Sequence, residues 1–84
     1  PRTIAELAAL AKEGTTDETL PLKQWLRNAE SARSRGRLSI EQNDYENGFI
    51  EMARAATIVL EKLPSHRDYR TLLSPTQRHN LGLV

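Results

Sequence analysis

Cysteine is absent from this chain of 84 residues, and its absence excludes several kinds of site. Without cysteine there is no disulfide framework, no zinc–thiolate site and no thiol nucleophile. Long apolar runs are absent as well, since none reaches the ~18–20 residues that a membrane-spanning helix needs. No secretory signal is visible. The absence of cysteine fits a reducing compartment such as the cytoplasm.

An excess of charge of one sign is also missing. Charged residues make up 27% of the chain, hydrophobic residues 38%, and the formal net charge is +1. This balance is ordinary for a soluble globular domain and does not require a nucleic acid or a membrane as partner. At this length we expect one small domain over residues 1–84. The chain begins at Pro1 rather than at Met and ends in an apolar tail, so we interpret it as a fragment of a longer protein.

The first half of the sequence predicts two helices. Thr3 and Glu6 have the S/T-x-x-E spacing of a capping box, and the short helix that they open should end before Gly14. Pro21 suits a first helical position and predicts a long second helix that runs to about Gln42. The apolar residues of this second helix recur every three or four positions, as Leu22, Trp25, Leu26, Ala29, Ala32, Gly36 and Ile40.

The second half predicts a third helix and the start of a fourth. Asp44 is a good N-cap, and Pro64 should end the third helix. Capping-box patterns at residues 65–68 and 74–77 then predict one short turn and a truncated fourth helix. The third helix is apolar on several sides and is therefore expected to be central. The predicted fold is all-α, a small bundle of three main helices. The apolar face of the third helix contains Tyr45, Phe49, Met52, Ala56, Val59 and Leu63.

The segment LEKLPSHRDYR, Leu60 to Arg70, has an enzymatic and a structural interpretation. In an enzyme, His66 would be a base oriented by Asp68, with an arginine binding an anion. However, no nucleophile of known spacing and no glycine-rich loop accompanies them. The structural interpretation is a helix end followed by a polar corner. It is favoured, with Leu63 and Tyr69 anchoring the corner in the bundle and His66 dispensable for any chemistry. If the His66 side chain is exposed, replacing it by alanine should cost about 0.5 kcal/mol or less.

Two further patterns have an ordinary explanation beside a functional one. His66 and His79 are isolated histidines without an H-E-x-x-H pattern, so no metal site is expected. The run of three arginines at residues 33–37 suggests nucleic-acid binding, but Arg35 faces nearly opposite to the other two on a helix. A solvated helix face is therefore favoured for this run.

Charges of opposite sign gather at the two ends of the third helix. Helix-dipole complementarity explains this pattern, and so does a basic rim that binds an acidic partner helix or tail. The two explanations stay open. The acidic residues are Glu41, Asp44, Glu46 and Glu51, and the basic group comprises Lys62, Arg67, Arg70 and Arg78 with both histidines.

The segment E-K-L-P-x-H-R-D-Y, residues 61–69, also carries a family resemblance. Together with PLKQWLR at residues 21–27 and with residues 44–50, it resembles the N-terminal helical domain of the AMSH-type deubiquitinases. That domain is a variant of the MIT (microtubule interacting and transport) module and is also called the ubiquitin-specific-protease-type dimerisation domain. Arg70 stands where the family has lysine. The similar phase of the helices extends from about Ile4 to Pro75.

The resemblance implies a protein-interaction domain without chemistry of its own. Such domains bind the C-terminal helical tails of ESCRT-III subunits on endosomes and bring a zinc-dependent, linkage-selective ubiquitin isopeptidase of the JAMM type to its substrates. The isopeptidase and its zinc lie in another domain of the parent protein. No catalytic, cofactor-binding or metal-binding residue is therefore expected here, nor membrane insertion or nucleic-acid binding. The family's fourth helix contributes to tail binding, and in this sequence Gln77, Arg78 and His79 fall in that region.

The sequence interpretation thus assigns two groups of residues. The partner-binding candidates are Lys62, Arg67, Arg70, Gln77, Arg78 and His79. The structural candidates are Trp25, Leu26, Phe49, Met52, Val59, Leu63 and Tyr69.

Two alternatives to tail binding remain. One is homodimerisation, in which apolar residues near the C-terminus fill the groove of a neighbour. The other is a stand-alone regulator that carries this domain and inhibits a deubiquitinase. The residues available for homodimerisation are Leu72, Leu73, Leu81, Leu83 and Val84.

Overall fold

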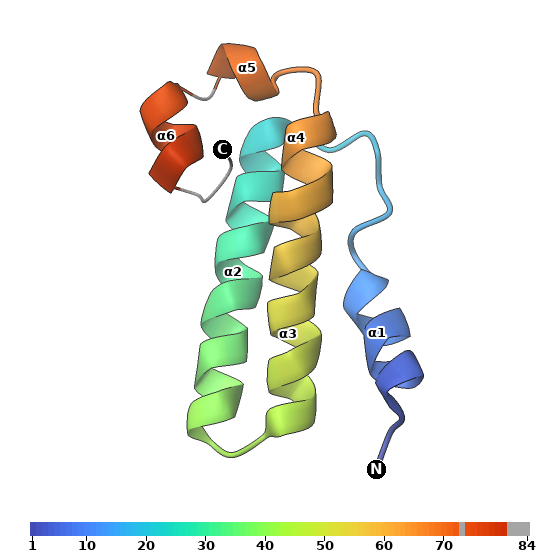
Figure 1. Cartoon of the computed structure of the whole chain (residues 1–84). Helices are drawn as coiled ribbons and strands as arrows, with labels where there is room; N and C mark the ends of the chain where they lie inside the picture. The colour runs from blue at the N-terminus through green and yellow to red at the C-terminus, as the bar shows by residue number, and fades with distance from the viewer. Residues whose placement is uncertain (73, 81–84) are drawn as a thin grey trace.

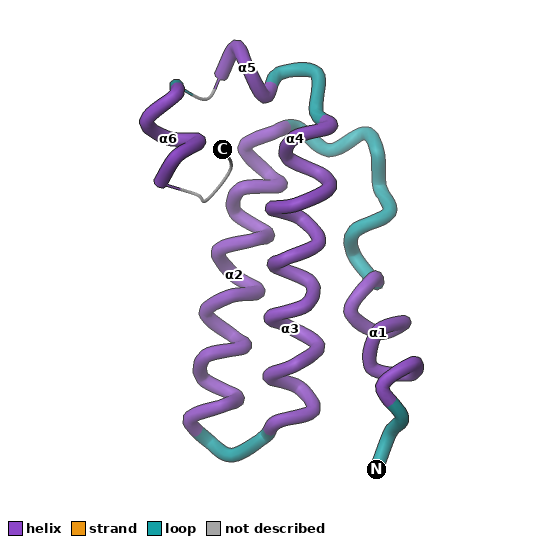
Figure 2. Tube along the Cα trace, in the orientation of Figure 1, coloured by secondary structure: helices purple, strands orange, loops and turns teal. Residues whose placement is uncertain are grey.

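The structure, a computed structural model, describes residues 1–72 and 74–80, and over these residues it is helical with no strand (Figures 1 and 2). The predicted all-α fold is therefore confirmed. No helix within these ranges has the length and apolar character needed to cross a membrane. The helices are α1 (Ile4–Lys12), α2 (Leu22–Glu41), α3 (Tyr45–Thr57), the π-helical η1 (Ile58–Lys62), α4 (Leu63–Ser65), α5 (Tyr69–Leu72) and α6 (Pro75–Asn80).

Helix α3 lies in the middle of the molecule, between α2 and α1 (Figure 1). The link of residues 42–44 is short, so α2 and α3 form an antiparallel hairpin that extends through η1 and α4. The long link between α1 and α2 runs along the same hairpin. The central position predicted for the third helix is confirmed, and one side of α3 has no neighbouring helix among residues 1–72 and 74–80.

The helix starts follow local cap chemistry. In α1, the Thr3 hydroxyl accepts from the Glu6 N–H while Glu6 accepts from the Thr3 N–H, both at 3.1 Å. Ser74 and Gln77 form the same reciprocal pair before α6. Asp44 accepts from the backbone N–H at the third position of α3. These three predicted starts are confirmed because a cap depends only on residues three apart.

The prediction that Pro64 ends the third helix is wrong. The helix continues to Ser65, and Leu63 keeps helical angles of φ −62° and ψ −51°. The Leu63 N–H donates to the carbonyl of Ile58, five residues earlier, in the wider π-helical turn of η1. This turn accommodates a residue that cannot donate a backbone hydrogen bond. Ser65 is therefore the last residue of α4 rather than an N-cap, and His66, directly after the helix, has an extended backbone conformation.

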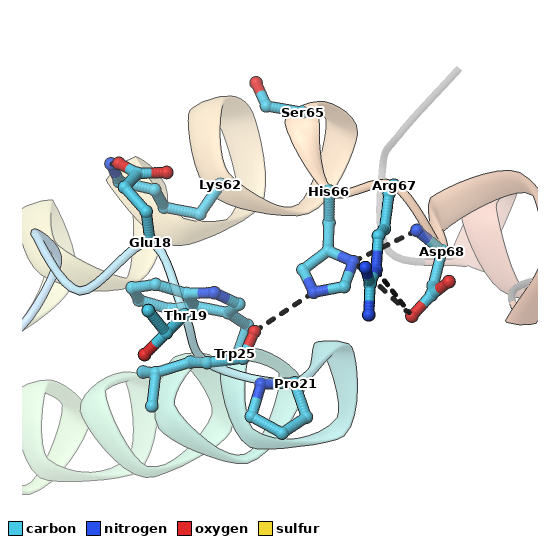
Figure 3. Close-up of a pocket in the computed structure, with 10 residues that line it drawn as sticks. Glu18, Thr19, Pro21, Trp25, Lys62, Ser65, His66, Arg67 and Asp68 are labelled. Atoms are coloured by element: carbon cyan, nitrogen blue, oxygen red, sulfur yellow. Dashed lines mark hydrogen bonds and ion pairs between the residues drawn. The ribbon is translucent and has the colours of Figure 1, made fainter.

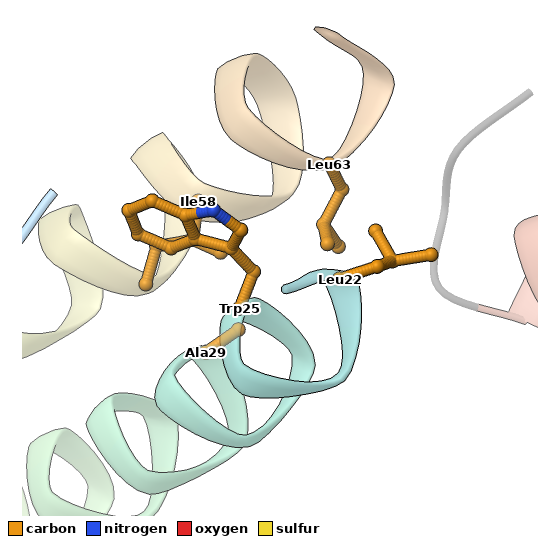
Figure 4. Packing of buried hydrophobic residues seen from close by; sticks show 5 residues of the cluster. All are labelled: Leu22, Trp25, Ala29, Ile58 and Leu63. Carbon is orange, nitrogen blue, oxygen red and sulfur yellow. The ribbon is translucent and has the colours of Figure 1, made fainter. Parts of the chain in front are cut away.

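One hydrophobic cluster joins the start of α2 to the end of the hairpin (Figure 4). Leu63 has no exposed surface, and Trp25 and Ile58 are buried beside it. Pro21 was predicted at the first helical position of α2, but it lies one position earlier, as the N-cap. The cluster contains Leu22, Trp25, Ala29, Ile58 and Leu63, and the half-buried Leu20, Leu26, Val59 and Tyr69 pack against it.

A second cluster attaches α1 to α3. Leu7 and Ala11 of α1 pack against Ile50, with Leu10 and Ala53 half-buried at the edge. A polar contact reinforces this attachment, because Arg54 of α3 donates to the backbone carbonyl of Leu10 at 2.9 Å.

Small residues allow α2 and α3 to approach closely. A Cβ at Gly36 would lie 3.0 Å from Cγ of Met52, and a Cβ at Gly48 would lie 2.7 Å from Cγ1 of Ile40. Gly36 was predicted in such a role, whereas Gly48 was not. These contacts leave the facing side of the hairpin without room for larger residues.

Candidate functional site

An apolar stripe remains uncovered along α3 and η1. Phe49, predicted on the buried face, is 43% exposed, and Leu60 is 68% exposed. Tyr45, expected on the same face, is also exposed. The reason is the central place of α3: α2 takes one side and α1 takes another, and these positions share the side that no other described helix covers. The prediction that this helix is packed on several sides is confirmed, but Tyr45, Phe49 and Leu60, which belonged to its predicted apolar surface, lie on a side that the described helices leave open.

Part of this open side forms a groove of about 400 Å³ between α2 and the α3–η1 helix. Its walls are mainly apolar, with Leu26 contributed by α2 and Ala56 and Leu60 by the opposite wall. Asn80 of α6 lies at its edge. We call this feature the α2–α3 groove. It is lined by Leu26, Ala29, Glu30, Arg33, Met52, Ala55, Ala56, Val59, Leu60, Leu63 and Asn80.

Charges lie along the α2 wall of the α2–α3 groove. Glu30 and Arg33 line it and are exposed. Arg35 points elsewhere and pairs with Glu51 of α3 at 2.6 Å. The three arginines at residues 33–37 therefore do not form one basic patch. This agrees with the prediction from their helical spacing.

The corner after α4 is built around His66, and the condition of an exposed side chain, on which the small expected cost of His66→Ala depended, is not met. The imidazole is 13% exposed and lies between two segments distant in sequence (Figure 3). Nε2 lies 3.0 Å from the carbonyl of Leu20, and Nδ1 accepts from the backbone N–H of Asp68 at 3.1 Å. Because a carbonyl only accepts, the tautomer with hydrogen on Nε2 satisfies both partners. His66 therefore ties the α1–α2 link to the corner.

The geometry of the corner does not provide a catalytic dyad. The carboxylate of Asp68 is 4.0 Å from Nδ1 of His66, beyond hydrogen-bond distance, and both ring nitrogens already have backbone partners. Within residues 1–72 and 74–80, no three His, Asp or Glu side chains are grouped so as to hold a metal ion. The helix-end interpretation describes this corner better than the enzymatic one.

A second concave site, which we call the corner hollow, has a volume of about 440 Å³ and lies beside His66 (Figure 3). Trp25 and Pro21 form part of its wall, and Lys62 pairs across it with Glu18 at 2.9 Å. The hollow is lined by Glu18, Thr19, Leu20, Pro21, Trp25, Lys62, Ser65, His66, Arg67 and Asp68.

The six partner-binding candidates do not come together in one surface. Lys62 and Arg67 line the corner hollow, and Arg70 lies exposed on α5. The remaining three belong to α6, which ends at the α2–α3 groove. There, Gln77 caps its own helix, His79 is exposed and the Arg78 guanidinium lies 5.5 Å from the centre of the Tyr69 ring. Sequence reasoning did not assign Leu60 or Ala56 to a site, although their four-residue spacing was a usable signal.

The shifted acid groups belong to turns and caps rather than to either concave site. Hydrogen bonds from the side chain and backbone of Asn47 hold the pKa of Asp44 below its ordinary value. The Thr3 backbone N–H, followed by its hydroxyl, lowers the pKa of Glu6. The Thr19 hydroxyl, followed by its backbone N–H, lowers the pKa of Asp17.

Comparisons with known proteins give one consistent similarity. The chain is 31% identical over 78 residues to a STAM-binding protein-like protein of Xenopus laevis, and the matched segment covers 89% of this chain and 19% of the relative. It is 26% identical over 72 residues to the STAM-binding protein of Rattus norvegicus, covering 86% of this chain and 17% of the relative. It is 29% identical over 73 residues to the AMSH-like protease of Homo sapiens, and this match covers 83% of this chain and 17% of the protease.

No family model and no solved structure matches the chain. The chain spans about a fifth of the length of the curated relatives that it matches. Because STAM-binding proteins and an AMSH-like protease from three animals each match more than four fifths of the chain, the similarity marks the chain as an AMSH-related region.

Proposed function

We propose that this region is an MIT-like docking domain that recruits an AMSH-type deubiquitinase to the C-terminal helical tails of ESCRT-III subunits on endosomes. In this proposal the domain has no chemistry of its own. The zinc-dependent, linkage-selective isopeptidase is another domain of a cytoplasmic parent protein.

The observation that carries the proposal is the α2–α3 groove. Leu60, Ala56 and Met52 lie at helical spacing along one wall, and Leu26 faces them from α2. An amphipathic helix laid along such a groove inserts residues at i, i+3 or i+4 and i+7 between the two walls. Arg33 on the rim pairs with an acidic side chain of the tail, and Glu30 with a basic one. A tail helix of mixed charge fits this arrangement.

The similarity to larger proteins supports the docking role. The matched relatives include AMSH-like proteases, and the matched region makes up only 17% of such a protein. A small region attached to a larger enzyme, with an apolar groove between two of its helices, suits recruitment better than chemistry.

The experiment is a titration of fluorescently labelled ESCRT-III tail peptides with the wild-type chain and two matched variants. Leu60→Asp places a charge in the groove, whereas Leu38→Asp makes the same change at an exposed leucine of α2 that does not line it. Leu60→Asp should weaken binding by about tenfold or more. Leu38→Asp should leave the Kd within about twofold. Equal Kd values for all three proteins, or no binding at millimolar peptide, would reject the proposal.

Homodimerisation is the second candidate, and the exposure of Phe49 and Leu60 favours it. A second copy of the chain could cover the open side of α3 instead of a tail helix. The residues that the sequence interpretation assigned to this contact lie outside the described side chains. Light scattering tests the candidate at high protein concentration. A mass of twice 9.5 kDa that Leu60→Asp reduces to the monomer supports it, and a monomeric wild type rejects it.

A further inference from the structure

The corner hollow is separate from the α2–α3 groove, since no residue lines both. It is formed by the α1–α2 link on one side and by the chain around α4 on the other (Figure 3). The contact of His66 Nε2 with the Leu20 carbonyl joins these sides, and the bond from the Asp68 N–H to Nδ1 holds the imidazole ring in place on its own side. The separation of the walls is therefore fixed before anything binds, which lowers the entropy cost of binding.

Lys62 and Arg67 are the cationic groups that line this hollow, and Lys62 is the more buried of the two. Its side chain is 21% exposed, so most of the stem is packed against the wall while the ammonium group reaches Glu18 at 2.9 Å. Glu18 is 78% exposed and belongs to the α1–α2 link. An ion pair with so exposed a partner contributes little to stability. A carboxylate from another molecule can therefore replace Glu18 at small cost to the fold.

Trp25 supplies a second donor. Its ring is buried, and its nitrogen lies at the edge of the ring on the side of Lys62 (Figure 3). The indole N–H has no hydrogen-bond acceptor among the described residues. Its nitrogen is also not among the fully buried polar atoms without a partner, so it keeps some solvent-accessible surface. An indole nitrogen only donates, so it is satisfied by an incoming oxygen. Arg67, exposed at the edge of the hollow, adds a third donor.

We propose that the corner hollow binds the carboxylate of an acidic segment of a partner protein, and that Glu18 is the chain's own occupant, which the partner's carboxylate displaces. Lys62 supplies the charge, and Trp25 supplies a hydrogen bond. A carboxylate fits better than a phosphate because Glu18 and Asp68 already place negative charge at the edge, which repels a doubly charged group more strongly. This inference goes beyond tail binding in the groove, because it concerns a different surface.

The test uses the peptide acetyl-Gly-Glu-Glu-Glu-Gly-amide, with the same peptide carrying glutamine in place of glutamate as a neutral control. Trp25 is the sole tryptophan of the chain, so its indole N–H gives a single resonance in a nitrogen–proton NMR spectrum. The acidic peptide should shift this resonance in a saturable way, and the neutral peptide should not. An indole signal that does not respond to the acidic peptide at millimolar concentration overturns the proposal.

Variants separate this site from general attraction of an acidic peptide to basic residues. Glu18→Gln removes the internal competitor and should strengthen binding by about twofold to fivefold, the value of an exposed ion pair. Lys62→Gln should abolish the indole shift, whereas Lys23→Gln, an exposed lysine outside the hollow, should leave it unchanged. Glu18→Gln alters only an exposed side chain and keeps the fold intact. Unchanged or weaker binding by Glu18→Gln contradicts the proposal even if Lys62→Gln fails to fold.

Discussion

Leu63→Ala should be among the most damaging changes in this chain. Leu63 has no exposed surface and lies in the cluster that joins the start of α2 to the end of the hairpin. The change removes three carbon atoms, worth about 2.4 kcal/mol at about 0.8 kcal/mol for each buried group. The cavity that remains raises the cost to about 3 kcal/mol. A domain of this size has roughly 4–12 kcal/mol of stability in total.

Urea unfolding followed by circular dichroism measures this cost, with Leu60→Ala as the matched control. Leu60 is 68% exposed, so removing the same atoms there should cost about 0.5 kcal/mol or less. The two variants should therefore differ by about 2 kcal/mol or more in the free energy of unfolding. Equal losses, or a larger loss for Leu60→Ala, would refute the assignment of Leu63 to the core and of Leu60 to the open side.

Two further predictions concern polar contacts. His66→Ala should lower the free energy of unfolding by about 1–3 kcal/mol, because it leaves the backbone groups of Leu20 and Asp68 without a partner, while His79→Ala should leave the urea midpoint almost unchanged. Asp44→Ala should lower the melting temperature at neutral pH through loss of the α3 cap. Because the folded-state pKa of Asp44 lies below its ordinary value, this contribution is present above the ordinary pKa and is lost as pH falls through the folded pKa. The gap between the melting temperatures of wild type and Asp44→Ala should therefore narrow in acid, and a gap that widens would contradict the cap.

The helix starts could be predicted from the sequence because each depends on residues three apart. Thr3 with Glu6 and Ser74 with Gln77 form their hydrogen bonds whatever the rest of the chain does. The stripe that begins at Leu22 and Trp25 was equally readable, since a long helix with one apolar face has one way to bury it.

Features that depend on tertiary packing could not be predicted in this way. Phe49 continues an apolar stripe, but only the positions of α1 and α2 decide that its side of α3 stays open. Pro64 breaks an ideal helix, yet the π-helical turn before it lets the chain continue. The structural role of His66 could not be predicted, because its partner Leu20 is 46 residues away and no local pattern reveals that contact.

In the candidate site, too, local features could be predicted from the sequence, whereas features that depend on tertiary packing could not. The basic residues after α3 were identified from charge alone, but the structure divides them between the corner hollow and α6. The α2–α3 groove depends on Leu26 and Leu60 facing one another from two helices, which sequence spacing within one helix does not show.

The most direct test of the docking proposal is a map of backbone amide shifts when an unlabelled ESCRT-III tail peptide is added to the isotopically labelled chain. The largest shifts should follow the α2–α3 groove, at Leu26, Arg33, Ala56 and Leu60, and should saturate with one peptide per chain. Amides of α1 that face away from the groove, such as that of Ala9, should move little. Shifts concentrated on α1, or an unchanged spectrum at millimolar peptide, would contradict the account.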